Sequence, residues 1–254
     1  MVKRKLVNGI PSLLLCVAAI IMIFPAIMIL LRSFENGVST YIDFYIWEPK
    51  YLHALSKSLV ISLGASIGTV IVSTMAAYVF SKVKFKGRDV LFYLYIIVMM
   101  MPFQVTLLPQ YMVSKSLGIY DTALSLILPG IFSPFATFLL TQVMKSVPNE
   151  IIEAARIDTS STWKILLKII IPSIKPGIIC AWVLSFTEHW NAVAEPLILM
   201  ETHSKYPLAV LLDSVSAEST LGFAAVVMFA VLPLLLFLLF ETEVMEGLGE
   251  YRLK

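Results

Sequence analysis

The sequence predicts an all-α, polytopic membrane protein whose six transmembrane helices form a single transmembrane domain over residues 1–254. Two observations predict this fold class. First, 59% of the residues are hydrophobic and only 14% are charged, with a mean hydropathy of +0.88, whereas a soluble domain is about half apolar and a quarter charged. Second, six apolar stretches are each long enough to cross about 30 Å of hydrocarbon as a helix. They cover roughly residues 10–31, 58–80, 90–113, 122–144, 173–200 and 221–240.

The first apolar stretch follows a basic cluster at residues 3–5, which is also how a cleaved signal peptide begins. The stretch continues to Leu31, so it is long enough to span the membrane. Cys16 lies inside it without the small preceding residue of a lipoprotein cleavage site, and Cys180 lies far away in another apolar run. We therefore expect a first transmembrane helix and no disulfide.

The next three stretches carry small residues and prolines. Gly64 and Gly68 are four residues apart in the second stretch, a spacing that lets two helices approach closely, within one chain or between subunits. The third and fourth stretches each contain two prolines, which kink membrane helices. These prolines are Pro102, Pro109, Pro129 and Pro134. Bent helices suit a pathway that opens alternately to each side, and they also occur in static bundles.

The fifth stretch ends in a polar segment, Phe186–Asn191, and the sixth is uninterrupted by charge. Ionisable residues at membrane depth usually face the bundle interior or a cavity, so Glu188 is a candidate for a transport pathway. Trp190 and Asn191 are candidates beside it, because aromatic rings and amides suit the ring faces and hydroxyls of sugars. The alternative is that these residues lie at the wet interface and cap the helix.

Lysine and arginine are distributed unequally between the two sides of this topology. With the N-terminus inside, the cytoplasmic segments hold 14 of these residues and the opposite segments hold 5. Because positive loops stay in the cytoplasm, the bias predicts that both termini and the loop over residues 146–172 are cytoplasmic.

This cytoplasmic loop contains a short amphipathic helix. Pro148 is expected in its first turn, where the missing N–H costs nothing. The apolar side is formed by Ile151, Ile152, Ala155 and, less cleanly, Ala154, and the polar side by Glu150, Glu153 and Arg156. A helix this short is marginal alone, so we expect it to dock on another surface. A generic amphipathic helix between two spans is the alternative.

The spacing along this loop resembles the EAA loop of the permease subunits of binding-protein-dependent ABC importers. Here Glu153-Ala154-Ala155 is followed by three residues, Thr159, nine residues and Ile169-x-Ile171-Pro172. The family has Gly and Leu where this chain has Thr159 and Ile171. The flanking sequence, Ser146–Pro148 through Lys175–Pro176, is similar to the carbohydrate-uptake branch, in particular to the smaller six-helix permease of maltose-type importers.

The threonine is a departure from the family pattern. A β-branched residue fits poorly at positive φ, so we expect the turn after the helix to differ in geometry from that of the family. If the turn nevertheless keeps a positive φ at Thr159, then Thr159→Gly should be neutral or slightly stabilising.

The resemblance implies a type I ABC importer permease fold with a cytoplasmic coupling helix, in the bacterial inner membrane. The implied partners are a second homologous permease, an ABC ATPase dimer that carries ATP and Mg, an external substrate-binding protein and the lipid bilayer. The residues implied in ATPase coupling are Glu153, Ala154, Ala155, Arg156, Asp158, Thr159 and Pro172. By position, the loop 201–220 is implied to contact the binding protein through Tyr206, Pro207 and Asp213, and the Trp190-Asn191 pair matches one in related permeases.

Several chemistries are missing from the sequence. No glycine is followed by lysine, so there is no P-loop, and neither His-Glu-x-x-His nor Gly-x-Ser-x-Gly occurs. The three histidines, His53, His189 and His203, lie in separate segments. We therefore expect no catalytic residue, no metal site and no cofactor in this chain, and no nucleic acid as partner. An ion-coupled secondary transporter is the alternative, although neither inverted repeats nor mid-membrane charges are clear.

Overall fold

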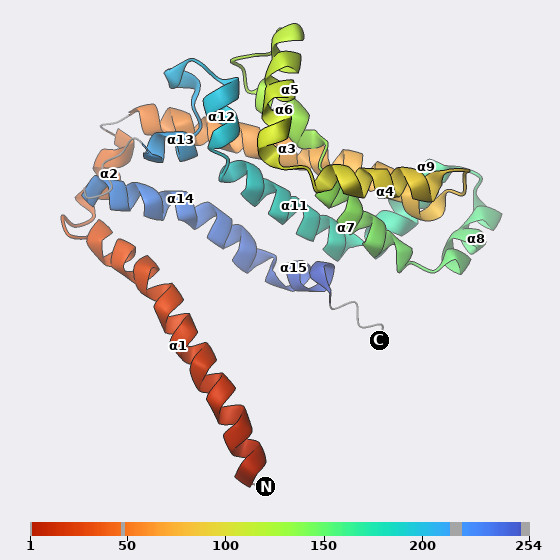
Figure 1. Cartoon of the computed structure of the whole chain (residues 1–254), viewed down its shortest axis with the longest axis horizontal. Helices are drawn as coiled ribbons and strands as arrows, with labels where there is room; N and C mark the ends of the chain where they lie inside the picture. The colour runs from red at the N-terminus through yellow and green to blue at the C-terminus, as the bar shows by residue number, and fades with distance from the viewer. Residues whose placement is uncertain (1, 47–48, 214–219, 250–254) are drawn as a thin grey trace. The chain divides into compact units, whose positions relative to one another are not determined.

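The computed structural model describes residues 2–46, 49–213 and 220–249, and within these ranges the chain consists of helices and connecting loops (Figure 1). Four described helices are long and apolar enough to cross a membrane, and the number rises to six if each of two bent helix pairs is one span. The all-α, polytopic fold class predicted from hydropathy is therefore confirmed. The contacts divide the chain into two compact units.

The first unit comprises residues 1–52 and 211–231. It contains α1 (Val2–Ser33), α2 (Ser39–Ile46) and the beginning of α14 (Thr220–Leu239). From Leu14 to Arg32 the side chains of α1 are exposed, apart from the partly buried Ile29, as expected for a helix whose solvent is lipid. The turn after α1 is closed by the Ser33 hydroxyl, which lies 2.6 Å from the Tyr41 hydroxyl.

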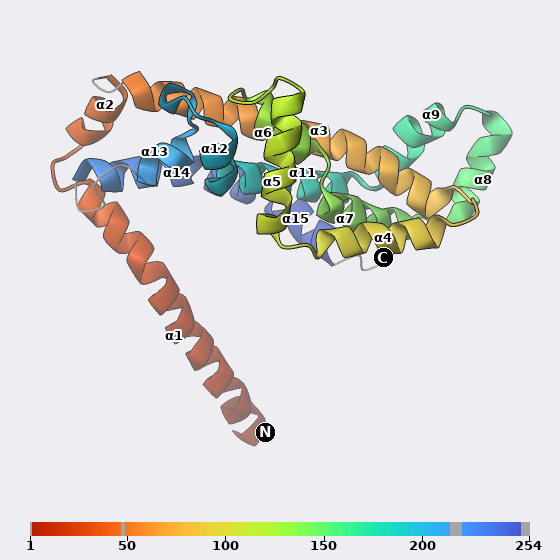
Figure 2. The ribbon, with the colours of Figure 1, turned by 45° about the horizontal axis from the view of Figure 1, so that its top comes forward.

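The second unit comprises residues 53–210 and 232–254. It holds most of α3 and most of the helices that follow, and Figure 2 shows them from a second side. In chain order they are α3 (Pro49–Lys82), α4 (Arg88–Met99), α5 (Phe103–Ser116), α6 (Leu124–Ile131), α7 (Pro134–Lys145), α8 (Asn149–Asp158), α9 (Thr162–Ile165), η1 (Leu166–Ile170), α10 (Ile171–Ser173), α11 (Lys175–Trp190), α12 (Ala194–Leu199), η2 (His203–Lys205), α13 (Leu208–Asp213) and α15 (Glu241–Leu248). Three helices, α3, α13 and α14, each continue from one unit into the other.

Three of the predicted continuous spans are interrupted. The stretch 90–113 bends by 99° between α4 and α5, because Pro102 has the extended ψ of 132° and begins a new helix. The stretch 122–144 changes helix at Ser133, whose hydroxyl caps α7 by accepting from the Ala136 N–H at 3.2 Å. In the stretch 173–200, α11 stops at Trp190 and α12 resumes at Ala194. The single domain over residues 1–254 stays a prediction.

The glycine pair of the second stretch packs within the chain. Gly64 faces Ile127 and Gly68 faces Ile131, so two turns of α6 lie directly against α3. A Cβ at Gly68 would overlap the Ile131 side chain. The Thr69 hydroxyl donates to the Gly130 carbonyl at 2.8 Å and fixes the register of the two helices. The glycine spacing was predicted to serve helix packing within one chain or between subunits, and these contacts show packing within the chain.

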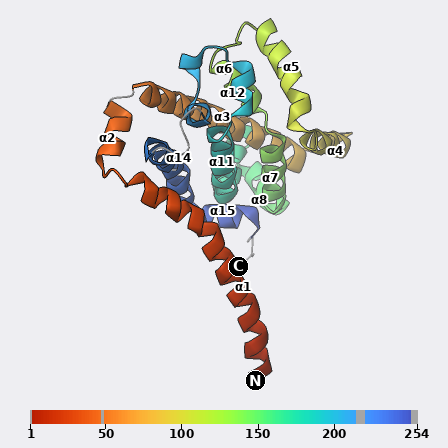
Figure 3. The same cartoon turned by 60° about the vertical axis from the view of Figure 1, so that its left-hand side comes forward.

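The main core of the second unit joins α3, α7, α8, α11 and the segment between α8 and α11. Its fully buried side chains include Leu140, Met144, Ile170 and Ile174. Figures 1 and 2 show α8 and α9 at one end of this unit. Figure 3 shows α6 and α12 side by side. The helix α8 and the α6–α12 pair therefore lie in different parts of the second unit.

Candidate functional site

The first candidate site is α8, which forms where the amphipathic pattern predicts a helix. Its first residue is Asn149, and Pro148 precedes it with φ −59° and ψ 139°. The proline therefore lies one position before the expected first turn, where its fixed φ directs the chain into the helix. Glu150 lies in the first turn and Arg156 in the last, which suits the helix dipole at both ends.

The face by which α8 docks is narrower than the sequence predicts. Only Ile152 and Ala155 are buried, both in the core cluster shared with α3, α7 and α11. Ile151 and Ala154, predicted on the apolar face, are exposed, because the helix touches the core along a single edge. Ile157 is 87% exposed. We call the remaining surface the outer face of α8, and its exposed residues are Glu150, Ile151, Glu153, Ala154, Arg156, Ile157 and Asp158.

The beginning of α8 is held by the end of α3. Lys82 Nζ donates to the Val147 carbonyl at 2.6 Å and to Asn149 Oδ1 at 3.2 Å. Together with the buried Ile152, these contacts fix both the position and the direction of a helix that would be marginal alone. Within the described residues, by contrast, the Glu153 carboxylate forms no hydrogen bond or ion pair. The helix α8 is thus held rigidly, and Glu153 on its outer face has no partner among the described residues.

The turn after α8 does not have positive φ. Thr159 is extended, with φ −153° and ψ 135°, a conformation that suits a β-branched residue. Its Oγ1 accepts from the Ser161 N–H at 3.3 Å. The condition under which Thr159→Gly would be neutral is therefore not met.

We now expect Thr159→Gly to destabilise this turn by about 0.4–1 kcal/mol, because glycine has more conformational freedom to lose. Thr159→Val keeps the β-branch and removes only the hydroxyl, so it should cost less. Hydrogen exchange of the amides between residues 155 and 165 measures both variants. Equal protection in wild type and Thr159→Gly would contradict the expectation.

Pro172 follows a wide helical turn. Proline has no N–H for the carbonyl four residues earlier, and the preceding segment η1 widens so that the Ile171 N–H donates to the Leu166 carbonyl. Ser173 Oγ donates to the Ile169 carbonyl at 2.7 Å, which satisfies another group at the break. The proline of the EAA pattern thus marks the bend of 80° between residues 162–173 and α11. The roles of Pro172 and the outer-face residues in ATPase coupling stay predictions.

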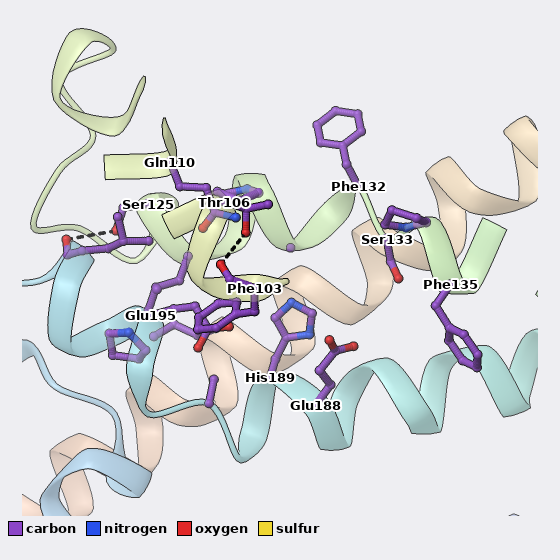
Figure 4. Close-up of a pocket in the computed structure, with 18 of the residues that line it drawn as sticks. Phe103, Thr106, Gln110, Ser125, Phe132, Ser133, Phe135, Glu188, His189 and Glu195 are labelled. Atoms are coloured by element: carbon purple, nitrogen blue, oxygen red, sulfur yellow. Dashed lines mark hydrogen bonds between the residues drawn. The ribbon is translucent and has the colours of Figure 1, made fainter. Parts of the chain in front are cut away.

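The second candidate site is a cavity of about 420 Å³ in the second unit. It lies between α3, the broken pair α4–α5, the α6–α7 junction, α11 and α12 (Figure 4). Its polar wall consists of Ser58, Thr106, Gln110, Ser125, Ser133, Glu188, His189 and Glu195, and its aromatic wall of Phe103, Phe132 and Phe135. This volume and mixture of groups are typical of small-molecule sites.

Of the three predicted pathway residues, only Glu188 lines this cavity. Trp190 is 1% exposed and stacks on Phe186, with ring centroids 5.6 Å apart. Asn191 is exposed, and its amide donates to the Thr187 carbonyl at 2.8 Å. Asn191 thus caps the end of α11, as the alternative prediction had it, whereas Trp190 packs in the interior. Their place in a pathway stays a prediction that this geometry does not favour.

Beside Glu188, the structure brings His189 and Glu195 into the cavity wall, two residues to which the sequence analysis assigned no role. His189 lies directly against Gly130, and a Cβ there would overlap its Nε2 atom. Helical spacing could have found Glu188 but not Glu195, because the latter reaches the cavity only through the chain break before α12.

The predicted binding-protein contacts are less accessible than expected. Pro207 is buried and lines the cavity, because the following Leu208 N–H donates to Ser58 Oγ at 2.8 Å and draws the chain inward. Tyr206 is half-buried, and the Asp213 side chain lies outside the described residues. Among the side chains of this loop that the structure describes, the exposed ones are those of residues 201–204.

Asp121, which the sequence did not single out, organises that exposed loop. Its carboxylate accepts from the Glu201 N–H at 2.9 Å, the Thr202 N–H at 3.0 Å and the Thr202 hydroxyl at 2.7 Å. Lys205 Nζ forms an ion pair with it at 2.6 Å. The Lys205 ammonium and then the Thr202 and Glu201 donors hold the pKa of Asp121 well below its usual range. Asp121 also has a φ of 60°, a conformation that Asp and Asn tolerate better than most residues.

Comparison with known proteins identifies the family. Residues 68–242 match the family described as the binding-protein-dependent transport system inner membrane component. The chain belongs to this family. As such an inner membrane component, it is a multi-pass transport protein, and the predicted membership in this class of permease is confirmed.

Relatives and solved structures agree with the family. The inner membrane component is 29% identical over 252 residues to the arabinooligosaccharides transport system permease protein AraQ of Halalkalibacterium halodurans, covering 91% of this chain and 90% of AraQ. It is 30% identical over 202 residues to the sn-glycerol-3-phosphate transport system permease protein UgpE of Brucella abortus, covering 77% and 72%. A bacterial ABC transporter that imports the acidic polysaccharide alginate superposes with a TM-score of 0.80 at 18% identity, covering 94% and 96%. The permease fold of an ABC importer is thereby shown.

Proposed function

We propose that this chain is the transmembrane permease subunit of an ATP-driven importer that takes up a sugar or oligosaccharide delivered by an external binding protein. The oligosaccharide permease AraQ supports the substrate class. A solved alginate ABC transporter is in complex with a periplasmic protein that carries an alginate pentasaccharide, which supports delivery by a binding protein. ATP and Mg would be bound by a separate ATPase pair, and a second homologous permease would complete the pathway.

The geometry of α8 is the observation that carries the proposal. The helix is fixed to the core by Ile152, Ala155 and the two Lys82 contacts, and it presents an exposed outer face that combines acids with isoleucines. A partner that held this face could move α3, α7 and α11 together, because a close-packed core transmits displacement as a body. Closure of the ATPases would then tilt these helices and turn the cavity from one side of the membrane to the other.

The charge bias supports a cytoplasmic position for α8 and for both termini. We expect single cysteines placed in the loops 82–88 and 147–159 to be labelled by an impermeant reagent from the cytoplasmic side only. The background variant is Cys16→Ser with Cys180→Ala, because Cys16 is exposed. Labelling of either loop from outside intact cells would contradict the orientation and the coupling role with it.

Co-purification tests the function as a whole. The tagged chain, extracted from its native membrane, should carry a second permease and an ATPase. ATP hydrolysis by this complex in proteoliposomes should rise on addition of the binding protein with its bound sugar. A chain that purifies without an ATPase and transports in response to an ion gradient would identify an ion-coupled carrier instead.

A further inference from the structure

We infer that the cavity of the second unit takes a neutral, hydroxyl-rich substrate and excludes anionic sugars such as sugar phosphates and uronates. The inference rests on the proposed function and narrows its substrate class. It is not evident from the relatives, because their names include arabinooligosaccharides, sn-glycerol-3-phosphate and the acidic polysaccharide alginate. The preference for a neutral substrate is instead inferred from the charges and hydrogen-bonding groups of this cavity.

The wall of the cavity is acidic. Its ionisable residues are Glu188, His189 and Glu195, and no lysine or arginine is among the residues that line it. Within the described part of the chain, neither glutamate forms an ion pair or a side-chain hydrogen bond. Figure 4 shows Glu188 and His189 projecting from α11 on the side of the cavity. An anion that entered would meet two carboxylates and no basic side chain of this chain.

Thr106, Ser125 and His189 add further acceptors to the wall. The Thr106 hydroxyl donates to the Phe103 carbonyl at 2.8 Å, and the Ser125 hydroxyl to the Thr122 carbonyl at 2.8 Å. Each of these hydroxyls has used its one proton and keeps lone pairs for a ligand. His189 Nδ1 lies 2.7 Å from the Ser185 carbonyl. Since a carbonyl only accepts, Nδ1 carries the proton, and in the neutral ring Nε2 is an acceptor.

A wall with two carboxylates and these acceptors favours a ligand that donates, while the Ser58 and Ser133 hydroxyls, which accept from backbone N–H groups, and the Gln110 amide keep protons for the oxygens of a sugar. Sugar hydroxyls donate and accept, and hydrogen bonds to carboxylates are stronger than those between neutral groups. The charged oxygens of a phosphate or a uronate carboxylate only accept, so they would face the like charge of the two glutamates. The phenyl rings of Phe103, Phe132 and Phe135 supply apolar area for the C–H faces of a sugar ring. Glu188 and Glu195 are thus assigned as specificity-determining residues.

The charge of the cavity can be measured without knowing the substrate. In the Cys16→Ser, Cys180→Ala background, Gln110→Cys places one thiol in the cavity wall. Its modification rates are measured with the cationic trimethylammonioethyl and the anionic sulfonatoethyl methanethiosulfonates, on the complex in proteoliposomes. Each rate is divided by the rate of the same reagent with free cysteine. We expect the normalised ratio to favour the cation by about tenfold at low salt, and to fall toward one when Glu188→Gln and Glu195→Gln are added.

The matched control is Glu201→Gln, which removes an exposed carboxylate that does not line the cavity and should leave the ratio unchanged. A normalised ratio of one or below in the unaltered cavity would overturn the inference. So would a ratio that does not respond to the two glutamine substitutions.

Uptake separates this inference from the proposed function. Cells with the complete importer are given arabinotriose, its anionic counterpart trigalacturonate, and a cationic glucosamine oligomer. Uptake of the neutral sugar alone supports the inference. Uptake of trigalacturonate, or preference for the cationic sugar, overturns it and leaves carbohydrate import intact. If no carbohydrate is taken up, the proposed function fails, while the reagent ratio still decides whether the cavity excludes anions.

Discussion

Replacement of Glu153 by lysine is expected to abolish uptake while the chain remains inserted and folded. The side chain is exposed on the outer face of α8 and forms no hydrogen bond or ion pair within the described residues. The buried contacts that hold α8, at Ile152 and Ala155, lie on the other edge of the helix. The substitution therefore removes nothing that the fold uses.

The loss of uptake would arise at the contact between α8 and the ATPase. A carboxylate that pairs with a basic residue of the ATPase and becomes partly buried there is worth about 2–5 kcal/mol when one member of the pair is removed. Reversal of its sign adds repulsion to that loss. This is enough to separate two proteins without unfolding either one, since each 1.4 kcal/mol is a factor of about ten in affinity.

The measurements are co-purification of the ATPase and binding-protein-stimulated ATP hydrolysis in proteoliposomes. Glu153→Gln is the matched control, because it keeps the shape and removes only the charge, so its effect should be intermediate. A compensating charge reversal in the ATPase should restore part of the activity of Glu153→Lys. Wild-type coupling in Glu153→Lys would remove α8 from the proposed mechanism.

Hydropathy and loop spacing predicted the features that depend on local sequence. The membrane class follows from composition, and α8 lies within a residue or so of its predicted position because its amphipathic pattern and Pro148 define it locally. The predictions that were wrong concern details that depend on tertiary contacts. Whether Ile151 or Ile152 is buried depends on how narrow an edge the core presents, and no periodicity within α8 contains that information.

The helix breaks and the cavity could not be predicted from the sequence for a related reason. Prolines predicted bends, but not that Pro102 would turn the chain by 99° and that Ser133 would begin a separate helix. The break between α11 and α12 brings Glu195 to the same wall as Glu188. Trp190 belongs to a recognisable pair, yet a single pair cannot reveal that its ring packs on Phe186 in the interior.

Asp121 shows the limit most clearly, because its partners lie about eighty residues away in sequence. We expect Asp121→Asn to release the loop 201–205. Asparagine tolerates the positive φ of this position, so the backbone strain that alanine would introduce is avoided. The amide cannot accept at both former oxygens, and it leaves the Lys205 ammonium without its counter-charge. The Glu201 and Thr202 amides should then exchange with deuterium faster than in the wild-type protein.

The pH dependence of this contact has a definite sign. The pKa of Asp121 is lowered in the folded loop, so the ionised form stabilises the loop at every pH above the usual carboxyl pKa of about 3.9. That stabilisation is lost as the pH falls below this value and the carboxylate is protonated. Protection of the two amides, measured relative to the intrinsic exchange rate, should therefore be constant between about pH 5 and 8 and should decline only in stronger acid. In Asp121→Asn the protection should be low throughout and show no such decline.

The consequence for transport follows if this exposed loop meets the binding protein. A loop that is correctly ordered in only about a tenth of the molecules raises the apparent dissociation constant about tenfold, because only the ordered fraction binds. Asp121→Asn should accordingly raise the concentration of binding protein that gives half-maximal ATP hydrolysis, and leave the maximal rate close to that of the wild type. Lys205→Met should do the same to a smaller extent, since the Glu201 and Thr202 donors to Asp121 remain. A fall in the maximal rate with an unchanged half-maximal concentration would mean that Asp121 acts on the transport cycle and not on docking.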